Sequence, residues 1–400
     1  MSRTAMSRTV IVAGVGLIPF TKPGASKPYD EMGAEATTLA LRDAGLEYGQ
    51  VQQAAVGYVF GESTSGQAAL YRVGLSGIPV FNINNNCSTG SSALFLARQM
   101  VASGTLECAL ALGFEQMQAG ALKALWEDRV SPFRRFNALC DEINPYPEVP
   151  LALRYFGGAG KEYMDTYDTG PELFAKVRVK ASRHAEHNPF ALFRKVLTED
   201  EVLQSPLVFP AAGLTRLMAC APTCGAAAAI LVSEEFARKH GLDARVSIAA
   251  QAMTTDTGSS FGERSMMKLV GFDMARAAAD EVYTAAGVGP EDLDVVELHD
   301  CFAQNEVLSY EALRLCAPGG AEKFVADGDN TYGGSHVTNP SGGLLSKGHP
   351  LGATGLAQCH ELVTQLRGQA GVRQVEGARI ALQHNLGLGG ACVVTMYRRD

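Results

Sequence analysis

The chain has 400 residues, a formal net charge of -8 and an isoelectric point near 5.6. This length can bury one large core or two medium ones, and the acidic balance argues against a general nucleic-acid binder, which normally presents a basic surface. No uninterrupted apolar run reaches the roughly 18 residues that a membrane-spanning helix requires, so we expect no membrane insertion.

We recognise no targeting signal at either end of the sequence. The start lacks the apolar core and cleavage site of a signal peptide, and the last residues, Tyr397–Asp400, are not a peroxisomal signal. The nine cysteines are odd in number and scattered, which favours free thiols over a disulfide framework. We therefore expect a cytoplasmic protein.

Apolar strand-like runs alternate with amphipathic helical stretches along most of the chain. In chain order, we expect a strand at Val10–Val15, helices at Glu35–Ala44 and Thr89–Ser103, strands at Glu107–Phe114, Ala227–Val232 and Asp294–Leu298, helices at Val307–Leu315 and Gly355–Leu366, and a strand at Ala378–Gln383. This alternation predicts an α/β fold with mostly parallel sheets.

One unit of this pattern occurs twice. Cys87 precedes a helical stretch that runs to Gly104, and a strand follows; His349 precedes a helical stretch that runs to Gly368, and a strand again follows. Each unit also has a glycine three positions after the reactive residue. The repeat predicts two similar halves, each of which brings one reactive residue to a helix N-terminus.

The alternation stops between about Trp126 and Pro206. Proline, glycine and aromatic residues are frequent there, which predicts an inserted loop subdomain. The stretch also carries a cluster of basic residues, namely Lys176, Arg178, Lys180, Arg183, Arg194 and Lys195. They form either a solvated helix face or a binding site for the phosphates of an anionic ligand, and the residues alone leave both possibilities open.

Cys87 lies in the run Asn84-Asn-Asn-Cys-Ser-Thr-Gly90. A thiol at a helix start is close to the positive end of the helix dipole and to free backbone amides, which stabilise a thiolate. The same amides can bind an oxyanion when the thiolate attacks a carbonyl carbon. A buried structural cysteine is the alternative, but the polar asparagines and Gly90 favour a nucleophile.

Two histidines have a similarly informative context. His349 lies at a helix start, which favours the neutral imidazole and suits a base that deprotonates a thiol. His299 and Cys301 directly follow a predicted strand, where α/β sheets place their sites. A zinc site would need about four ligands at recognisable spacing, and no further Cys or His lies near this loop, so we expect no metal.

A glycine-rich turn follows the last predicted strand. His384, Asn385 and Gly387 begin it, and we expect this turn to present polar groups and backbone amides to an oxyanion or substrate. A glycine turn without an anion is the competing interpretation. Cys220 and Cys224 have no companion motif, so we interpret them as core thiols.

These motifs, in this order, resemble the thiolase superfamily, and within it the sterol-carrier-protein type. The matching segments are Asn84–Gly90, Glu297–Phe302, Asp329–Gly334, Asn339–Gly355 and Gln383–Gly390. The resemblance implies two similar βαβαβαββ halves in a five-layer α/β/α/β/α core with an inserted loop domain. It places the N-terminal half at 1–125 plus about 207–243, the inserted domain at 126–206 and the C-terminal half at 244–400.

The resemblance also implies roles for the reactive residues. Cys87 corresponds to the family's nucleophile and His349 to the histidine that activates it and lines an oxyanion hole. Ordinary thiolases use a second cysteine in a late Cys-x-Gly motif, and this chain has Asn385-Leu-Gly387 there. The sterol-carrier type is thought to use the cysteine that follows its histidine and aspartate, which is Cys301 here, while His299 would stabilise an enolate oxygen.

We therefore expect a degradative 3-ketoacyl-CoA thiolase, an acetyl-CoA C-acyltransferase that needs no cofactor, takes CoA and acyl-CoA as substrates and forms a homodimer or homotetramer. The candidate CoA contacts are Lys176, Arg178, Lys180, Arg183, Ser259 and Ser260. Three rivals remain: a decarboxylating ketoacyl synthase, which also pairs a cysteine with two histidines; an aldolase-type enzyme on the same fold; and a non-catalytic protein that binds acyl-CoA or lipid.

Overall fold

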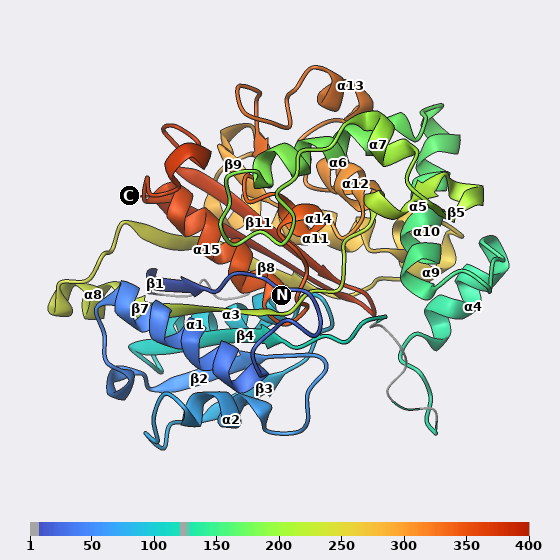
Figure 1. Cartoon of the computed structure of the whole chain (residues 1–400). Helices are drawn as coiled ribbons and strands as arrows, with labels where there is room; N and C mark the ends of the chain where they lie inside the picture. The colour runs from blue at the N-terminus through green and yellow to red at the C-terminus, as the bar shows by residue number, and fades with distance from the viewer. Residues whose placement is uncertain (1–7, 121–125, 127, 400) are drawn as a thin grey trace.

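The computed structural model describes residues 8–120, 126 and 128–399. Residues 1–7, which belong to the expected N-terminal half and to the segment compared with a signal peptide, lie outside the described residues. The first half of the chain folds as a βαβαβαββ unit, which lies in the lower part of Figure 1 and is blue and cyan except for the yellow-green β7. Its elements are β1 (Val10–Leu17), α1 (Tyr29–Ala44), β2 (Gln53–Gly57), α2 (Ser65–Tyr71), β3 (Val80–Ile83), α3 (Thr89–Ala102), β4 (Cys108–Glu115) and β7 (Gly225–Ser233).

The second half repeats this order of elements, with short additional helices. The repeated elements are β8 (Val246–Thr254), α11 (Phe272–Ala286), β9 (Val295–Glu297), α12 (Ala303–Ala312), β10 (Val337–Thr338), α15 (Thr354–Leu366), β11 (Ile380–Gly387) and β12 (Ala391–Arg399). The additional helices are α8 (Glu234–His240), α9 (Ser259–Gly262), α10 (Met266–Leu269), α13 (Ala321–Ala326) and α14 (Gly343–Ser346). Every strand and helix expected from the sequence overlaps an element of the same type.

The strands of both halves join in one ten-stranded sheet, in the order β10-β9-β11-β12-β8-β1-β7-β4-β2-β3. The halves meet where Ile11 of β1 pairs with Ser247 of β8. In each half, the inner strands pair antiparallel and the outer strands pair parallel. The expectation of mostly parallel sheets was therefore wrong, because the last strand of each half returns antiparallel between its neighbours.

The helices lie in three layers around the two halves of the sheet. Helix α1 packs on β1 and β7 on one outer side, α11 packs on β8 and β12 on the other, and α3 and α15 pack against each other between them. Glycine makes this central contact possible, because a Cβ on Gly90 would lie 2.7 Å from the carbonyl oxygen of Gly352. The predicted five-layer thiolase fold is confirmed, and its central layer brings together α3, whose start follows Cys87, and α15. The expectation that His349 lies at a helix start was wrong, because α15 begins only at Thr354 and His349 lies in the loop between α14 and α15.

The segment between β4 and β7 is largely helical, which corrects the expectation of an irregular loop subdomain. It forms α4 (Arg134–Ile143), α5 (Leu151–Tyr167), α6 (Glu172–Ala185), α7 (Glu199–Leu203) and a small hairpin of β5 (Leu207–Phe209) and β6 (Leu214–Thr215). Pro150 and Pro171 precede helices rather than interrupt them. The glycines of α5 allow close packing, since a Cβ on Gly160 would lie 2.3 Å from the Gln304 side chain. The expected domain boundaries stay a prediction.

Among the helices of the described residues, none is both long and apolar enough to cross a lipid bilayer. The expected cytoplasmic location is a separate matter and stays a prediction.

Candidate active site

Three predicted side chains meet at the centre of the molecule. Cys87 precedes α3, His349 lies between α14 and α15, and His299 follows β9. All three are buried, and one ligand atom of each lies within 4.8 Å of those of the other two. The two imidazole rings pack edge to face with their centroids 5.1 Å apart. Segments more than 200 residues apart in sequence thus converge on one sulfur atom.

The Cys87 thiol rests in its protonated form. Burial raises its pKa to about 12, and the nearby Glu115 carboxylate adds to this effect. The backbone amides of Leu388 and of Cys87 itself act in the opposite direction, as donors that stabilise a thiolate. The thiol donates a hydrogen bond to Asn86 Oδ1 at 3.6 Å, and Asn86 has a φ of 51°, a left-handed conformation that asparagine tolerates well. This thiol needs a base before it can attack.

His349 provides a ring nitrogen for that purpose. Its Nδ1 lies 2.6 Å from Thr354 Oγ1, and the Thr354 hydroxyl donates to the carbonyl oxygen of Pro350 at 3.0 Å. Because that hydroxyl has one hydrogen, its oxygen accepts the Nδ1–H of His349, which leaves a lone pair on Nε2. Among the described residues, this buried Nε2 has no hydrogen-bond partner. Burial lowers the pKa of His349 to about 3, so the ring is a neutral acceptor.

His299 shows the opposite arrangement. Its Nδ1 lies 3.1 Å from the side-chain nitrogen of Asn385, which also donates to the carbonyl oxygen of Cys87 at 3.1 Å. An amide nitrogen is a donor, so Nδ1 accepts and the ring proton lies on Nε2. Burial holds the pKa of His299 well below its ordinary value of 6.5, helped by His349 and His384. The neutral ring is therefore a hydrogen-bond donor.

Cys301 is buried near enough to Cys87 and Cys220 for their charges to act on it, and its role in the site stays a prediction. Burial raises the pKa of Cys301 well above 9, and the nearby Cys220 and Cys87 raise it further. The amide of Cys220 donates to the carbonyl oxygen of Cys301 at 2.9 Å. Cys220, interpreted from the sequence as a core thiol, is instead half-buried beside the site, whereas Cys224 is a buried core thiol as expected.

Asp300 holds the loop of His299 and Cys301 in place. Its carboxylate accepts hydrogen bonds from the amides of Leu344 at 2.7 Å and Leu345 at 3.3 Å, near the start of α14. The contact depends on Gly343, whose φ is 60° and whose Cβ, if present, would lie 2.1 Å from Asp300 Oδ2. Asp300 thus joins the loop after β9 to the segment that carries His349.

Glu115, at the end of β4, was missed by the sequence analysis. Its buried carboxylate accepts the amides of Val59 at 3.0 Å, Phe60 at 2.9 Å and Gly352 at 3.0 Å. Burial raises its pKa to about 7, although the three amides oppose the rise. The carboxylate ties the loop after β2 to the loop after His349. An acidic residue that ends an apolar strand was the one available signal in the sequence.

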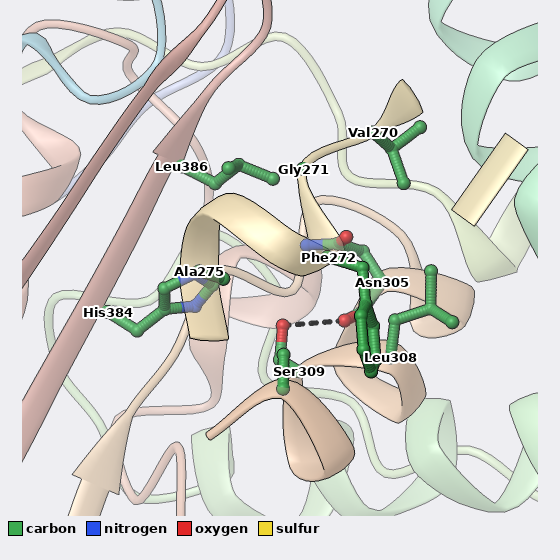
Figure 2. Close-up of a pocket in the computed structure, with 10 residues that line it drawn as sticks. Val270, Gly271, Phe272, Ala275, Asn305, Leu308, Ser309, His384 and Leu386 are labelled. Atoms are coloured by element: carbon green, nitrogen blue, oxygen red, sulfur yellow. Dashed lines mark hydrogen bonds between the residues drawn. The ribbon is translucent and has the colours of Figure 1, made fainter. Parts of the chain in front are cut away.

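His384 and Asn385 lie within β11 and not in the turn after it, which corrects the expected start of that turn. Successive side chains of a strand point to opposite faces, so Asn385 faces Cys87 and His384 faces away. The His384 ring lies beside Ala275 of α11, in a small cavity also lined by Ser309 of α12 (Figure 2). Its Nδ1 accepts the His299 amide at 3.5 Å. The His384 side chain therefore supports the loop of His299 from behind and does not face the oxyanion side.

Gly387 packs closely against the loop that carries Cys87. A Cβ at this position would lie 2.3 Å from the carbonyl oxygen of Asn85, so only glycine fits. The amide that acts on the Cys87 sulfur is that of the next residue, Leu388. The role expected for the Gly387 amide stays a prediction.

The structure contradicts a CoA-binding role for two of the basic residues on α6. Lys180 is buried and contacts Glu306 and Thr338, and Arg178 is buried and donates to Ser346 Oγ at 2.6 Å. Their positive charges are used inside the protein and cannot meet a phosphate at the surface. The remaining candidates stay predictions: Lys176 and Arg183 are exposed on α6, Ser259 is half-buried and Ser260 is buried.

Comparison with known proteins identifies the fold and the family. The model described as "Thiolase, N-terminal domain" matches residues 9–131, and the one described as "Thiolase C-terminal domain-like" matches residues 257–397. Sterol carrier protein 2 of Rattus norvegicus is 54% identical over 97% of this chain and 72% of its own length. Non-specific lipid-transfer protein-like 2 of Caenorhabditis elegans is 45% identical over 97% of this chain and 96% of its own length.

Other relatives share less sequence. Acetyl-CoA acetyltransferase of Methanothermobacter thermautotrophicus is 33% identical over 98% of this chain and all of its own length. An Ltp2–ChsH2(DUF35) aldolase structure superposes with a TM-score of 0.83 at 22% identity, covering 99% of each chain. Human mitochondrial 3-ketoacyl-CoA thiolase in complex with CoA superposes with a TM-score of 0.74 at 18% identity, covering all of both chains.

Proposed function

This chain belongs to the thiolase family, and from that premise we propose that it cleaves 3-ketoacyl-CoA by thiolysis through an acyl-Cys87 intermediate. One observation carries the proposal: the Cys87 sulfur lies beside an unpartnered acceptor nitrogen on one histidine and a ring N–H donor on another. Nucleophile, base and oxyanion donor are the three parts that acyl transfer through a thiolate requires.

In the first half-reaction, His349 Nε2 takes the proton of Cys87 as the sulfur attacks the 3-keto carbon of the substrate. The pKa of about 12 for Cys87 lies far above the pKa of about 3 for His349, so this transfer is unfavourable in the empty site and proceeds together with attack. The amides of Cys87 and of the turn after β11 stabilise the tetrahedral oxyanion. Its collapse breaks the bond between C2 and C3 of the substrate.

The leaving group is the enolate of acetyl-CoA or propanoyl-CoA. Its oxygen accepts the Nε2–H of His299 and the new Nε2–H of His349, and Cys301 delivers a proton to the carbanionic carbon. In the second half-reaction, the Cys301 thiolate takes the proton of the CoA thiol, which attacks the acyl carbon on Cys87. The shortened acyl-CoA leaves, and the Cys87 thiolate recovers the proton held by His349.

The experiment is thiolysis of acetoacetyl-CoA and of a longer 3-ketoacyl-CoA with CoA, followed by loss of the 3-keto chromophore. Cys87→Ala is expected to abolish turnover, and intact-protein mass spectrometry of the wild type after brief exposure without CoA is expected to show one acyl group on Cys87. Turnover that survives Cys301→Ala would remove Cys301 from the mechanism.

The rivals differ in what they require of these residues. A decarboxylating ketoacyl synthase needs no thiol at Cys301 and would turn over a malonyl thioester. An aldolase needs no thiolate at Cys87, and the likeness to the aldolase structure concerns the fold alone. A non-catalytic acyl-CoA or lipid binder, in line with the lipid-transfer name of the nematode relative, would bind its ligand equally well after Cys87→Ala.

For the CoA phosphates we propose the exposed basic residues of α6, Lys176 and Arg183, as contacts. The structure of the human thiolase in complex with CoA supports CoA as a ligand of this fold. Charge reversal by Lys176→Glu is expected to raise the KM for CoA several-fold with little change in kcat, and charge reversal of exposed Lys239 on α8 serves as the matched control. Equal KM values for CoA in both variants would exclude Lys176 as a contact for the CoA phosphates.

We also propose that the chain forms a homodimer through the β3 edge of the sheet. Strand β3 is the last strand of the order, and large apolar side chains are exposed on it and just before it: Tyr71 at 61%, Leu75 at 82% and Phe81 at 45%. An edge strand with apolar neighbours is prone to pair with another strand. Sedimentation analysis is expected to give a dimer for the wild type and a monomer for Phe81→Lys; a monomeric wild type would refute the proposal.

A further inference from the structure

The three side chains at the centre of the site are also three good ligands for a soft metal ion. Cys87, His299 and His349 could bind Zn²⁺ and leave a fourth position open, as catalytic zinc sites do. Nδ1 of each ring is already engaged, by Thr354 in His349 and by Asn385 in His299, so binding requires a thiolate and a lone pair on each Nε2. His349 Nε2 has that lone pair, but His299 Nε2 carries a proton. The position of the proton on the His299 ring therefore decides whether the three side chains can bind a metal ion or can donate a hydrogen bond to a substrate oxygen.

A buried chain of hydrogen bonds sets the state of that ring. The Tyr397 hydroxyl donates to Gln383 Oε1 at 2.5 Å, and Gln383 Nε2 donates to Ser91 Oγ at 2.7 Å and to the carbonyl oxygen of Gly355 at 2.7 Å. Ser91 Oγ then donates to Asn385 Oδ1 at 2.8 Å. Backbone carbonyls accept and cannot donate, so the Gly355 carbonyl fixes the orientation of the Gln383 amide.

The far end of the chain is fixed in the same way. Asn385 Nδ2 faces the carbonyl oxygen of Cys87 at 3.1 Å, which again demands a donor, and its second hydrogen points at His299 Nδ1. Asn385 and Gln383 are fully buried, so no solvent can substitute for a lost partner. Were the His299 proton on Nδ1, two buried donors would face each other at 3.1 Å.

We propose that Asn385 is a positioning residue that holds His299 in its Nε2–H tautomer, and that this both aims a donor at the substrate oxygen and withholds the third ligand from a Zn²⁺-like cation. The inference deepens the proposed thiolase function, and it assigns Asn385 a role through His299 rather than a contact with substrate. This chain of hydrogen bonds explains why the motif Asn385-Leu-Gly387 has an asparagine on the strand face towards Cys87. It also makes the tautomer of His299 independent of bound substrate.

The first test is made on the wild-type protein, with one variant used only for assignment. In protein labelled with ¹⁵N on its eight histidines, the ring nitrogens of His299, assigned by comparison with His299→Gln, are expected to show a protonated Nε2 and an unprotonated Nδ1 across neutral pH. A protonated Nδ1 in the wild type would overturn the proposal outright, whether or not the enzyme cleaves 3-ketoacyl-CoA.

The second test reverses the tautomer. In Asn385→Asp, a carboxylate accepts the Nδ1–H of His299, which moves the lone pair to Nε2 and recreates the carboxylate–histidine pair of many zinc sites. The variant is expected to bind Co²⁺ with the visible absorption of a thiolate–imidazole site and Zn²⁺ at least about 100-fold more tightly than the wild type, the scale on which such partners act. Both signals are expected to disappear on adding Cys87→Ala.

The matched control is Asn305→Asp, which places the same charge on a buried amide that contacts the backbone oxygen of His299 rather than its ring. It is expected to gain no cobalt spectrum. Metal binding by the wild type as tight as by Asn385→Asp would refute the proposal, and if that variant fails to fold, the ¹⁵N measurement alone decides. A wild type with the expected tautomer but no turnover of 3-ketoacyl-CoA would refute the proposed function and leave this inference intact.

Discussion

Replacing Glu115 by glutamine should change how the stability of this protein depends on pH. Burial raises the pKa of this carboxyl group from its ordinary value of 4.5 to about 7. An acid with a raised pKa in the folded state binds its proton more tightly there than in the unfolded chain. The stability that it contributes is therefore fully present below pH 4.5 and is lost as the pH rises through about 7.

The magnitude follows from the same values. Moving one pKa from 4.5 to about 7 corresponds to about 3 kcal/mol of unfolding free energy, and the side chain is 1% exposed, so solvent screening does not reduce it. The free energy of unfolding of Glu115→Gln minus that of the wild type is expected to rise by about 3 kcal/mol between pH 4.5 and pH 8. The neutral side-chain amide of the glutamine does not titrate. Any effect that it has on the three backbone contacts is therefore the same at every pH.

Urea unfolding followed by far-ultraviolet circular dichroism, at several pH values across this range, measures that difference. The same substitution at the exposed Glu62 serves as the matched control. A difference between Glu115→Gln and wild type that stays constant, or that falls as the pH rises, would refute the burial argument. The variant should also lower the pKa of Cys87, because the Glu115 charge contributes to raising it.

Three further outcomes follow from the geometry. Gly90→Ala places a methyl group against the helix opposite and is expected to cost about 1–3 kcal/mol of stability, whereas Gly262→Ala, with open space around it, should be nearly neutral in thermal unfolding. Lys180→Met leaves the buried Glu306 charge without its partner and is expected to cost about 3–5 kcal/mol, while the KM for CoA stays unchanged; a raised KM would restore Lys180 as a CoA contact. With a pKa of about 12, Cys87 is expected to react with iodoacetamide about tenfold faster for each pH unit, and a rate plateau near neutral pH would show that the resting sulfur is already a thiolate.

Local patterns in the sequence predicted the repeated unit and the position of its reactive residues. The spacing of apolar residues marked α3 and α15, and the residues before them identified Cys87 and His349 as a pair of reactive groups, although His349 lies in the loop before α15 and not at its start. Such features depend on neighbours within one or two turns of chain, which is the range that periodicity reports. The same reasoning failed between β4 and β7, where prolines that begin helices and glycines that allow close packing resembled the composition of a loop.

Tertiary structure decided how these groups act on one another. The lone pair of His349 points at the site because Thr354 occupies its other nitrogen, and the proton of His299 points there because Asn385, 86 residues later, donates to Nδ1. Glu115 joined the site only when the fold brought Gly352 to it. Burial then set the pKa of each group, and burial depends on every layer of the molecule, so no short stretch of sequence contains it.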